Sequence, residues 1–223
     1  MAPLIYIIRH GEAAHNVHRG YPERDPPLTK TGSYTTKHIY LPARPDLVLI
    51  SPMTRTLQTA VNMFPFLAGQ APFDIPVQVL PDLREANDAI CNKGLSRAEL
   101  KTKFPQFDFS ECNTEWDYEE HTTESAIERA ERVRKRLKEL SMTYNKIAVI
   151  THRGFKAFLV KGKRFGLAEV RCYRFASEEE SRDEKIRVGM NCDTLEDQDF
   201  GPTVLILEES QRKDLITQRD CDL

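Results

Sequence analysis

The chain has 223 residues, of which 40% are hydrophobic and 30% are charged, and its formal net charge is −2. This length and composition predict one globular domain, with an insertion at most, and exclude a fibrous or wholly disordered chain. The near-neutral charge gives no basic field for nucleic acid, and no apolar run approaches the ~20 residues that span a bilayer. We therefore expect a small-molecule partner, no nucleic acid and no membrane.

The 5 cysteines form an odd, scattered set without a C-x-x-C pair. Such a set indicates neither a disulfide framework nor a zinc site, and no other metal-ligand spacing occurs along the chain. No apolar signal segment follows Met1. The default expectation is therefore a reduced protein in the cytoplasm, without a bound metal.

Short apolar runs alternate with helix-like stretches along the chain. The runs typical of buried strands cover residues 4–8, 47–50, 77–80, 147–150 and 204–207. This order predicts an α/β fold, a three-layer sandwich whose mostly parallel central sheet has helices on both faces. In such sheets ligands bind beyond the carboxyl ends of the strands.

Two helices have clear start signals. The first follows the second apolar run, with Ser51 as N-cap and Pro52 at the first helical position. The second begins near residues 122–125, where Ser125 and Glu128 are spaced as a capping box. Apolar residues recur at helical spacing, namely Leu57, Ala60, Val61 and Phe64 in the first helix and Ala126, Ile127, Ala130, Val133, Leu137 and Leu140 in the second.

Residues 1–208 are expected to form a single domain. The charged residues 209–223 at the C-terminus are expected to form a mobile tail, and residues 177–185 an exposed loop.

Cationic side chains follow the ends of three predicted strands. Arg9 and His10 end the first run, Arg55 lies just after the second, and His152 and Arg153 follow the fourth. Because parallel strands end at one edge of a sheet, these side chains are expected to meet at a ligand site.

Two local features support an anion at this site. Arg55 would lie in the first turn of a helix, where its charge opposes the helix dipole, and a bound anion would remove that conflict. Adjacent residues on a strand point to opposite faces, so Gly11 is expected to allow the turn that brings Arg9 and His10 to one ligand.

The motifs together resemble the histidine phosphatase superfamily, in its phosphoglycerate-mutase-like branch. The resemblance covers about residues 1–160. It is carried by the pieces RHGE at residues 9–12, LT at 28–29 with Gly32, SPMTRTLQTA at 51–60, LREA at 83–86 and VITHRG at 149–154. The stretches HNV at 15–17, DPPLTKTG at 25–32 and FPQFDFSE at 104–111 further resemble a subgroup of mutase-like proteins frequent in fungi and plants.

The resemblance implies a phosphoryl-transfer mechanism without metal or other cofactor. His10 would attack phosphorus and form a phosphohistidine, while Arg9, Arg55 and a protonated His152 neutralise the phosphoryl oxygens. Glu85 would protonate the leaving oxygen as general acid.

Two residues of the first motif have open roles. Asn16 resembles a phosphate-contacting asparagine, whereas by itself it is typical of a turn. Glu12 either orients its loop or contacts the substrate.

The sequence departs from the family pattern at two places. Arg153 stands where the family has glycine after the second histidine, and residues 89–96 replace a Cys-Asp-Thr-Gly type of segment. Arg153 would either enter the pocket and bind a second anionic group of the substrate, or point outward to an acidic partner.

We therefore expect a phosphomonoester hydrolase acting on a small phosphorylated metabolite. The main alternative is a dehydratase, lyase or other repurposed enzyme that uses the anion pocket for a non-phosphorylated substrate. A phosphoglycerate mutase and a phospholigand binder without turnover are the remaining alternatives. The sequence does not indicate an oligomeric state.

Overall fold

The computed structural model describes residues 2–18, 20–114, 116 and 122–208. The C-terminal tail predicted for residues 209–223 lies outside the described residues.

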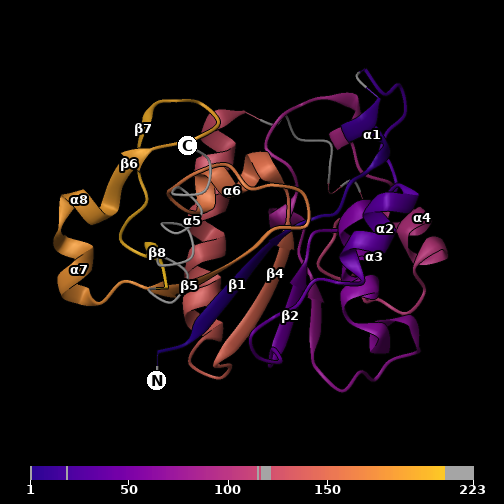
Figure 1. The fold of residues 1–223 in the computed structure, drawn as a ribbon, viewed down its shortest axis with the longest axis horizontal. Coiled ribbons are helices and arrows are strands. Elements are labelled where there is room, and N and C mark those ends of the chain that lie inside the picture. Colours follow the sequence, from indigo (N-terminus) through magenta and orange to yellow (C-terminus); the bar gives the residue numbers. More distant parts are fainter. Residues whose placement is uncertain (1, 19, 115, 117–121, 209–223) are drawn as a thin grey trace, which may run out of the picture.

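The fold is built on a six-stranded sheet with the strand order β3-β2-β4-β1-β5-β8 (Figure 1). The strands β3, β2, β4 and β1 are parallel to one another, whereas β5 runs antiparallel to both β1 and β8. Their bounds are β1 (Leu4–Arg9), β2 (Leu47–Ile50), β3 (Val77–Val79), β4 (Lys146–Thr151), β5 (Val170–Phe175) and β8 (Leu205–Leu207), and a separate ribbon pairs β6 (Val188–Met190) with β7 (Asp197–Asp199). The predicted α/β fold with a mostly parallel central sheet is confirmed.

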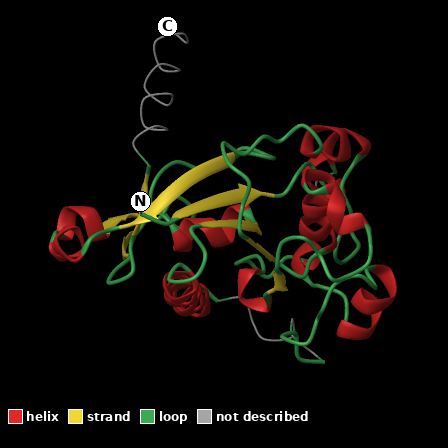
Figure 2. Cartoon of the chain, turned by 90° about the horizontal axis from the view of Figure 1, so that it is seen from below, coloured by secondary structure: helices red, strands yellow, loops and turns green. Residues whose placement is uncertain are grey.

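Helices lie on both sides of the sheet, with α5 and α6 on one side and α2, α3 and α4 on the other (Figure 1). The strands lie side by side in the view turned by 90° (Figure 2). The helices are α1 (Ala14–Val17), α2 (Lys30–Thr36), α3 (Thr54–Met63), α4 (Arg97–Lys103), α5 (Thr123–Leu140), α6 (Arg153–Leu159), α7 (Glu178–Arg182) and α8 (Glu184–Arg187), with 3-10 turns η1 (Pro65–Ala68), η2 (Pro81–Leu83) and η3 (Ile90–Asn92). None of the helices in the described ranges is long and apolar enough to span a membrane.

The alternation of side chains along β1 produces two hydrophobic cores. Ile5 and Ile7 pack in the cluster that contains the apolar faces of α5 and α6. Tyr6 and Ile8 pack in the other cluster, with Leu57 of α3. Because β1 is buried on both faces, its whole sequence is apolar up to Arg9, and the first polar side chains emerge where the strand ends.

Both helices predicted from start signals form, but their caps differ from the predictions. α5 is capped by the Thr122 hydroxyl, which accepts a hydrogen bond from the Ser125 N–H (3.1 Å), so the predicted Ser125 and Glu128 capping box is wrong. α3 begins at Thr54, and its N-cap position is occupied by Met53 without a side-chain bond. The predicted Ser51 cap is therefore also wrong, and the Ser51 hydroxyl instead contacts His152.

In the C-terminal half the structure contains one unpredicted strand and contradicts one predicted loop. The antiparallel strand β5 was not predicted, because Arg171 and Arg174 interrupt its apolar pattern. Each arginine is bonded to a glutamate, Glu169 and Glu180 respectively, which allows it to stand in a strand. The exposed loop predicted for residues 177–185 instead contains the short helix α7 and the start of α8.

Candidate active site

The ends of β1, β4 and β2 meet at one edge of the sheet. Arg9 is paired with Thr151 in the parallel register of β1 and β4. The next hydrogen bonds, from His10 N–H to the Thr151 carbonyl (3.1 Å) and from Ser51 N–H to the Ile150 carbonyl (3.0 Å), continue this register beyond the strands. As a result, the ring centroids of His10 and His152 lie 5.3 Å apart.

His10 is buried, and its hydrogen bond defines its tautomer. Its Nδ1 lies 2.7 Å from the Gly11 carbonyl oxygen. Since a carbonyl only accepts, Nδ1 carries the proton and Nε2 carries a free electron pair. Burial lowers the pKa of His10 well below 6.5, and the charges of Arg55 and Arg9 lower it further. His10 is therefore a neutral imidazole at pH 7, with Nε2 available as a nucleophile.

His152 is held on both ring nitrogens. The Nε atom of Arg55 donates to Nδ1 (3.2 Å), and Nε2 lies 2.8 Å from the Ser51 hydroxyl. Since a guanidinium only donates, the proton of the neutral ring lies on Nε2 and is donated to Ser51. Burial, together with the charge of Arg55, lowers the pKa of His152 well below 6.5. The protonated form implied by the resemblance therefore requires a nearby anion that raises this pKa.

Arg55 is buried and is oriented by the segment that departs from the family pattern. Its two terminal nitrogens donate to the Cys91 carbonyl (3.0 Å) and to Asn92 Oδ1 (3.0 Å). Asn92 is buried, and its own amide donates to the Asn87 carbonyl (3.1 Å). Residues 87–92 therefore set the direction of the guanidinium.

The chain itself places an acidic side chain at the N-terminus of α3. The buried carboxyl group of Asp25 accepts hydrogen bonds from the Thr54 N–H (2.8 Å) and the Thr54 hydroxyl (2.7 Å). Burial raises the pKa of Asp25, and its oxygens occupy the start of the helix, where the sequence predicted a bound anion. Asp25 was missed because it lies far from Thr54 in the sequence.

Arg9 points to the loop that precedes β5. Its guanidinium donates to the Phe165 carbonyl (2.8 Å). Lys156 Nζ and Arg171 Cζ lie 2.7 Å and 3.9 Å from the centroid of the Phe165 ring, so both side chains pack on the residue that orients Arg9. Burial lowers the pKa of Arg9 to about 10, and the charge of Arg153 contributes.

Glu85 is buried and fastens the first turn of α6. Its Oε1 accepts from the N–H groups of Ala86 (2.8 Å) and Phe155 (2.7 Å), and its Oε2 accepts from the Gly154 N–H (3.2 Å). A Cβ on Gly154 would lie 2.5 Å from Oε1, so only glycine allows this approach. The carboxyl is thereby fixed beside His152, which directly precedes α6.

Gly11 and Glu12 shape the loop after His10. A Cβ on Gly11 would clash with Thr36 Cγ2, so this glycine permits the close packing of α2, and its φ is not positive, so the expected turn needs no left-handed backbone. Glu12 orients its loop by accepting from the Thr29 hydroxyl (2.6 Å).

Asn16 is exposed and binds its own helix. Its Oδ1 accepts from the Ala13 N–H (2.9 Å), and its Nδ2 lies 3.2 Å from His15 Nε2. The residue of this loop that lies beside His10 is His15, whose ring centroid is 5.8 Å from that of His10. His15 was not predicted as a site residue, because in the sequence only its position next to Asn16 distinguishes it from other histidines.

Arg153 is exposed at the first position of α6. It is close enough to Arg9 and His15 to lower the pKa of each. Within the described ranges Arg153 forms no ion pair, so the acidic partner of the outward alternative is not found there.

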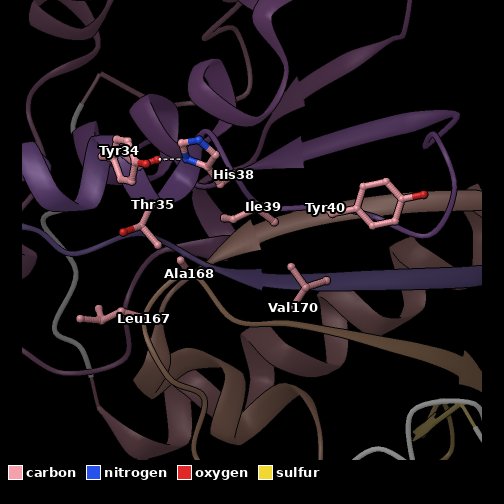
Figure 3. Close-up of a pocket in the computed structure, with 8 residues that line it drawn as sticks. All are labelled: Tyr34, Thr35, His38, Ile39, Tyr40, Leu167, Ala168 and Val170. Atoms are coloured by element: carbon pink, nitrogen blue, oxygen red, sulfur yellow. Dashed lines mark hydrogen bonds between the residues drawn. The ribbon is translucent and has the colours of Figure 1, made fainter.

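A separate open groove of about 430 Å³ lies between α2 and residues 167–170 (Figure 3). It is lined by exposed Tyr34 and Tyr40, and its floor includes Ala168, whose N–H donates to the His10 carbonyl (3.2 Å). None of the cationic side chains described above lines it. In the part of the chain that is described, no group of three or more His, Cys, Asp or Glu side chains could hold a metal ion.

Two known proteins are similar to this chain in sequence. A protein described as a probable phosphatase of Schizosaccharomyces pombe is 32% identical over 118 residues, which are 49% of this chain and 53% of that relative. The chain therefore matches about half the length of this relative. Phosphoglycerate mutase-like protein 1 of Arabidopsis thaliana is 29% identical over 195 residues, or 68% of each chain.

Solved structures share the fold. The alpha-ribazole phosphatase of Shigella flexneri has a TM-score of 0.53 at 20% identity and covers 78% of this chain and 91% of its own. The ecdysone phosphate phosphatase of Bombix mori, solved with tungstate, has a TM-score of 0.60 at 14% identity and covers 77% and 89%. The family model of the histidine phosphatase superfamily (branch 1) matches residues 5–177. The chain therefore belongs to the histidine phosphatase superfamily.

Proposed function

We propose that the protein hydrolyses phosphomonoesters of small metabolites through a phosphohistidine on His10. The observation that carries this proposal is the buried, neutral imidazole of His10, whose Nε2 is unprotonated beside the charges of Arg55 and Arg9. A phosphomonoester carries nearly two negative charges, which a neutral nucleophile approaches without repulsion. The surrounding cations then stabilise the charge of the transition state.

The reaction takes place in two displacements. His10 Nε2 forms a bond to phosphorus while the bond to the leaving oxygen breaks, and Glu85 gives that oxygen a proton. Water then attacks the phosphohistidine and returns a proton to Glu85, which releases phosphate and free His10. In both steps Arg9 and Arg55 bind the phosphoryl oxygens. The bound anion raises the pKa of His152. For a protonated ring to join them, His152 Nδ1 must exchange the Arg55 Nε–H for a phosphoryl oxygen.

The substrate is proposed to be small and to carry a second anionic group, which Arg153 would bind. The support is the exposed position of Arg153 near Arg9 and His15, without an ion pair in the described ranges. A single domain over residues 1–208 and a cytoplasmic location also stay predictions.

The covalent step is tested by a screen of phosphorylated metabolites for phosphate release, with His10→Ala in parallel. Turnover quenched in alkali should leave phosphate on His10, detectable by mass spectrometry under alkaline handling because phosphohistidine is stable to base. His18→Ala, which removes an exposed imidazole outside the site, is the matched control. If the wild-type protein is active without forming an adduct, and the His10→Ala protein keeps this activity, the dehydratase or lyase alternative is favoured.

We also propose that arginines and histidines supply all the charge neutralisation. Activity should then be complete in the presence of a chelator and strongly inhibited by vanadate, which imitates the five-coordinate transition state. If the chelator abolishes activity and a divalent ion then restores it, the result would contradict this proposal.

A further inference from the structure

His15 is the residue beside the nucleophile that the proposed mechanism does not use. It lies in α1, is partly buried, and its ring centroid is 5.8 Å from that of His10 at an angle of 49°. The resemblance found in the sequence assigns no role to His15, and its contacts indicate one.

The neighbouring asparagine defines the tautomer of His15. Asn16 Oδ1 accepts from the Ala13 N–H, so the amide nitrogen of Asn16 is the atom that faces His15 Nε2 at 3.2 Å. The opposite amide orientation would place two donors against each other at Ala13. Since an amide nitrogen only donates, Nε2 of His15 accepts, and the proton of the neutral ring lies on Nδ1.

The resulting Nδ1–H group is a donor without an acceptor. His15 Nδ1 is buried and has no hydrogen-bond partner within the described ranges. The groups that act on this ring are Arg55 from α3, Arg9 from β1 and Arg153 from α6, all of which are cations, and burial together with these charges lowers the pKa of His15 to about 3. A buried donor among cations requires an acceptor, and the surroundings favour an anionic one.

We propose that His15 is a further substrate-binding residue, whose Nδ1–H donates to a phosphoryl oxygen of the group that His10 attacks. Asn16 is then the positioning residue that keeps the proton on Nδ1, and its second amide hydrogen stays available for the phosphate contact that the resemblance implied. This inference rests on the proposed phosphatase function. It adds a neutral donor to a site whose other contacts are charged.

The direct test is His15→Phe, which keeps the ring and removes the donor. We expect kcat/KM for a phosphomonoester to fall about 10- to 100-fold, the range for a hydrogen bond to a charged group. His18→Phe makes the same change at an exposed histidine three residues after His15, and should leave kcat/KM unchanged. A His15→Phe protein with wild-type melting temperature and wild-type kcat/KM would overturn the inference.

Asn16→Asp tests the tautomer without removing His15. Asp keeps the acceptor for Ala13 N–H but presents an acceptor to His15 Nε2, so the ring proton moves to Nε2 and Nδ1 can no longer donate. The carboxylate also raises the pKa of His15. We expect activity to be low above this raised pKa and to recover on acidification, because the protonated ring again carries Nδ1–H.

The double variant His15→Phe with Asn16→Asp should lose this recovery. A purely structural role of Asn16 would give a loss that does not depend on pH, and that result would overturn the inference.

Nuclear magnetic resonance of protein labelled with ¹⁵N at the histidine rings separates this inference from the proposed function. We expect the His15 proton on Nδ1 at pH 7, and inorganic phosphate should shift the resonances of both His10 and His15. If phosphate shifts His10 and leaves His15 unchanged, the inference fails while the phosphatase function stands. If phosphate shifts neither ring and no phosphomonoester is hydrolysed, the proposed function fails and the inference with it.

Discussion

The imidazole rings of His10, His15 and His152 lie close together at the end of the sheet. Hydrogen bonds determine which nitrogen of each ring carries the proton. His10 holds it on Nδ1 through the Gly11 carbonyl, and His152 holds it on Nε2 because Arg55 donates to its Nδ1. At this scale the chemistry depends on which neighbour accepts and which donates. A change of one partner therefore alters reactivity even where the shape of the site is kept.

Glu85 provides a residue-scale prediction that separates acid catalysis from a structural role. If Glu85 is the general acid, Glu85→Gln should reduce the rate by about 10²-fold or more with alkyl phosphates and much less with nitrophenyl phosphate, whose leaving oxygen needs no proton. The carboxylate also holds the N–H groups of α6, so the variant should have a lower melting temperature. Glu12→Gln, which changes another loop carboxylate that accepts from the Thr29 hydroxyl, serves as control. Equal losses on both substrates would mean that Glu85 only supports α6.

Arg153 offers a second residue-scale prediction. If its guanidinium binds a second anionic group, Arg153→Gly should lose kcat/KM on a phosphate ester that carries a carboxylate, by about 1.5 to 3 kcal/mol, and should keep it on a simple monoester. Steady-state kinetics on the two substrates measures the difference. Equal rates on both, with a small change in melting temperature, would assign Arg153 to the surface.

The sequence predicted those site residues whose side-chain chemistry by itself indicates a role in binding or catalysis. Arg9, His10, Arg55, Glu85 and His152 lie together in the structure, because strand ends of a parallel sheet meet at one edge. Asp25 and His15 could not be found in this way. Their significance comes from contacts with residues that only folding brings close, or from a hydrogen bond that fixes a proton.

Arg55 is positioned by contacts of the elements around it. The first turn of α3 is held by Asp25 and the guanidinium by η3. The sequence predicted that α3 exists but placed its cap on Ser51, because local signals do not reveal that the capping carboxylate comes from a distant loop. In the same way β5 was missed, since its arginines are compatible with a strand only once Glu169 and Glu180 are beside them.

Asp25 gives the element-scale prediction. Asp25→Ala leaves the Thr54 N–H and hydroxyl without their buried acceptor, and should reduce the free energy of unfolding by about 1–3 kcal/mol. It should also raise KM, because the start of α3 carries Arg55. Urea unfolding and steady-state kinetics measure the two effects.

The control for this change is Asp46→Ala, which removes a more exposed carboxylate from the N–H groups of Asn145 and Lys146. It should leave KM unchanged. An Asp25→Ala protein as stable as wild type would show that solvent satisfies these groups and that the carboxylate is not needed.

The whole molecule should become less stable in mild acid. His10 and His152 have pKa values well below 6.5, and that of His15 is about 3. Near pH 6.5 the unfolded chain binds protons at these rings and the folded chain does not. The stability of the fold is therefore full above pH 6.5 and falls as the pH decreases below it, by at most about 1.4 kcal/mol per pH unit for each ring.

Urea unfolding at pH 7.5, 6.5 and 5.5 measures this dependence. His15→Phe should reduce the slope below pH 6.5, whereas His38→Phe, which removes an exposed ring, should not. An unfolding free energy that stays constant from pH 7.5 to 5.5 would contradict the prediction.

The hydrogen bond from His10 Nδ1 to the Gly11 carbonyl also affects how the intermediate breaks down. In the proposed mechanism the phosphoryl group is attached to Nε2 alone, so a single positional isomer of phosphohistidine forms. The ring keeps its Nδ1 proton and becomes cationic when it is phosphorylated, and the carbonyl dipole of Gly11 stabilises that charge. When water attacks, the ring departs as a neutral imidazole instead of an anion. In that mechanism, one main-chain carbonyl would make His10 both a competent nucleophile and a good leaving group.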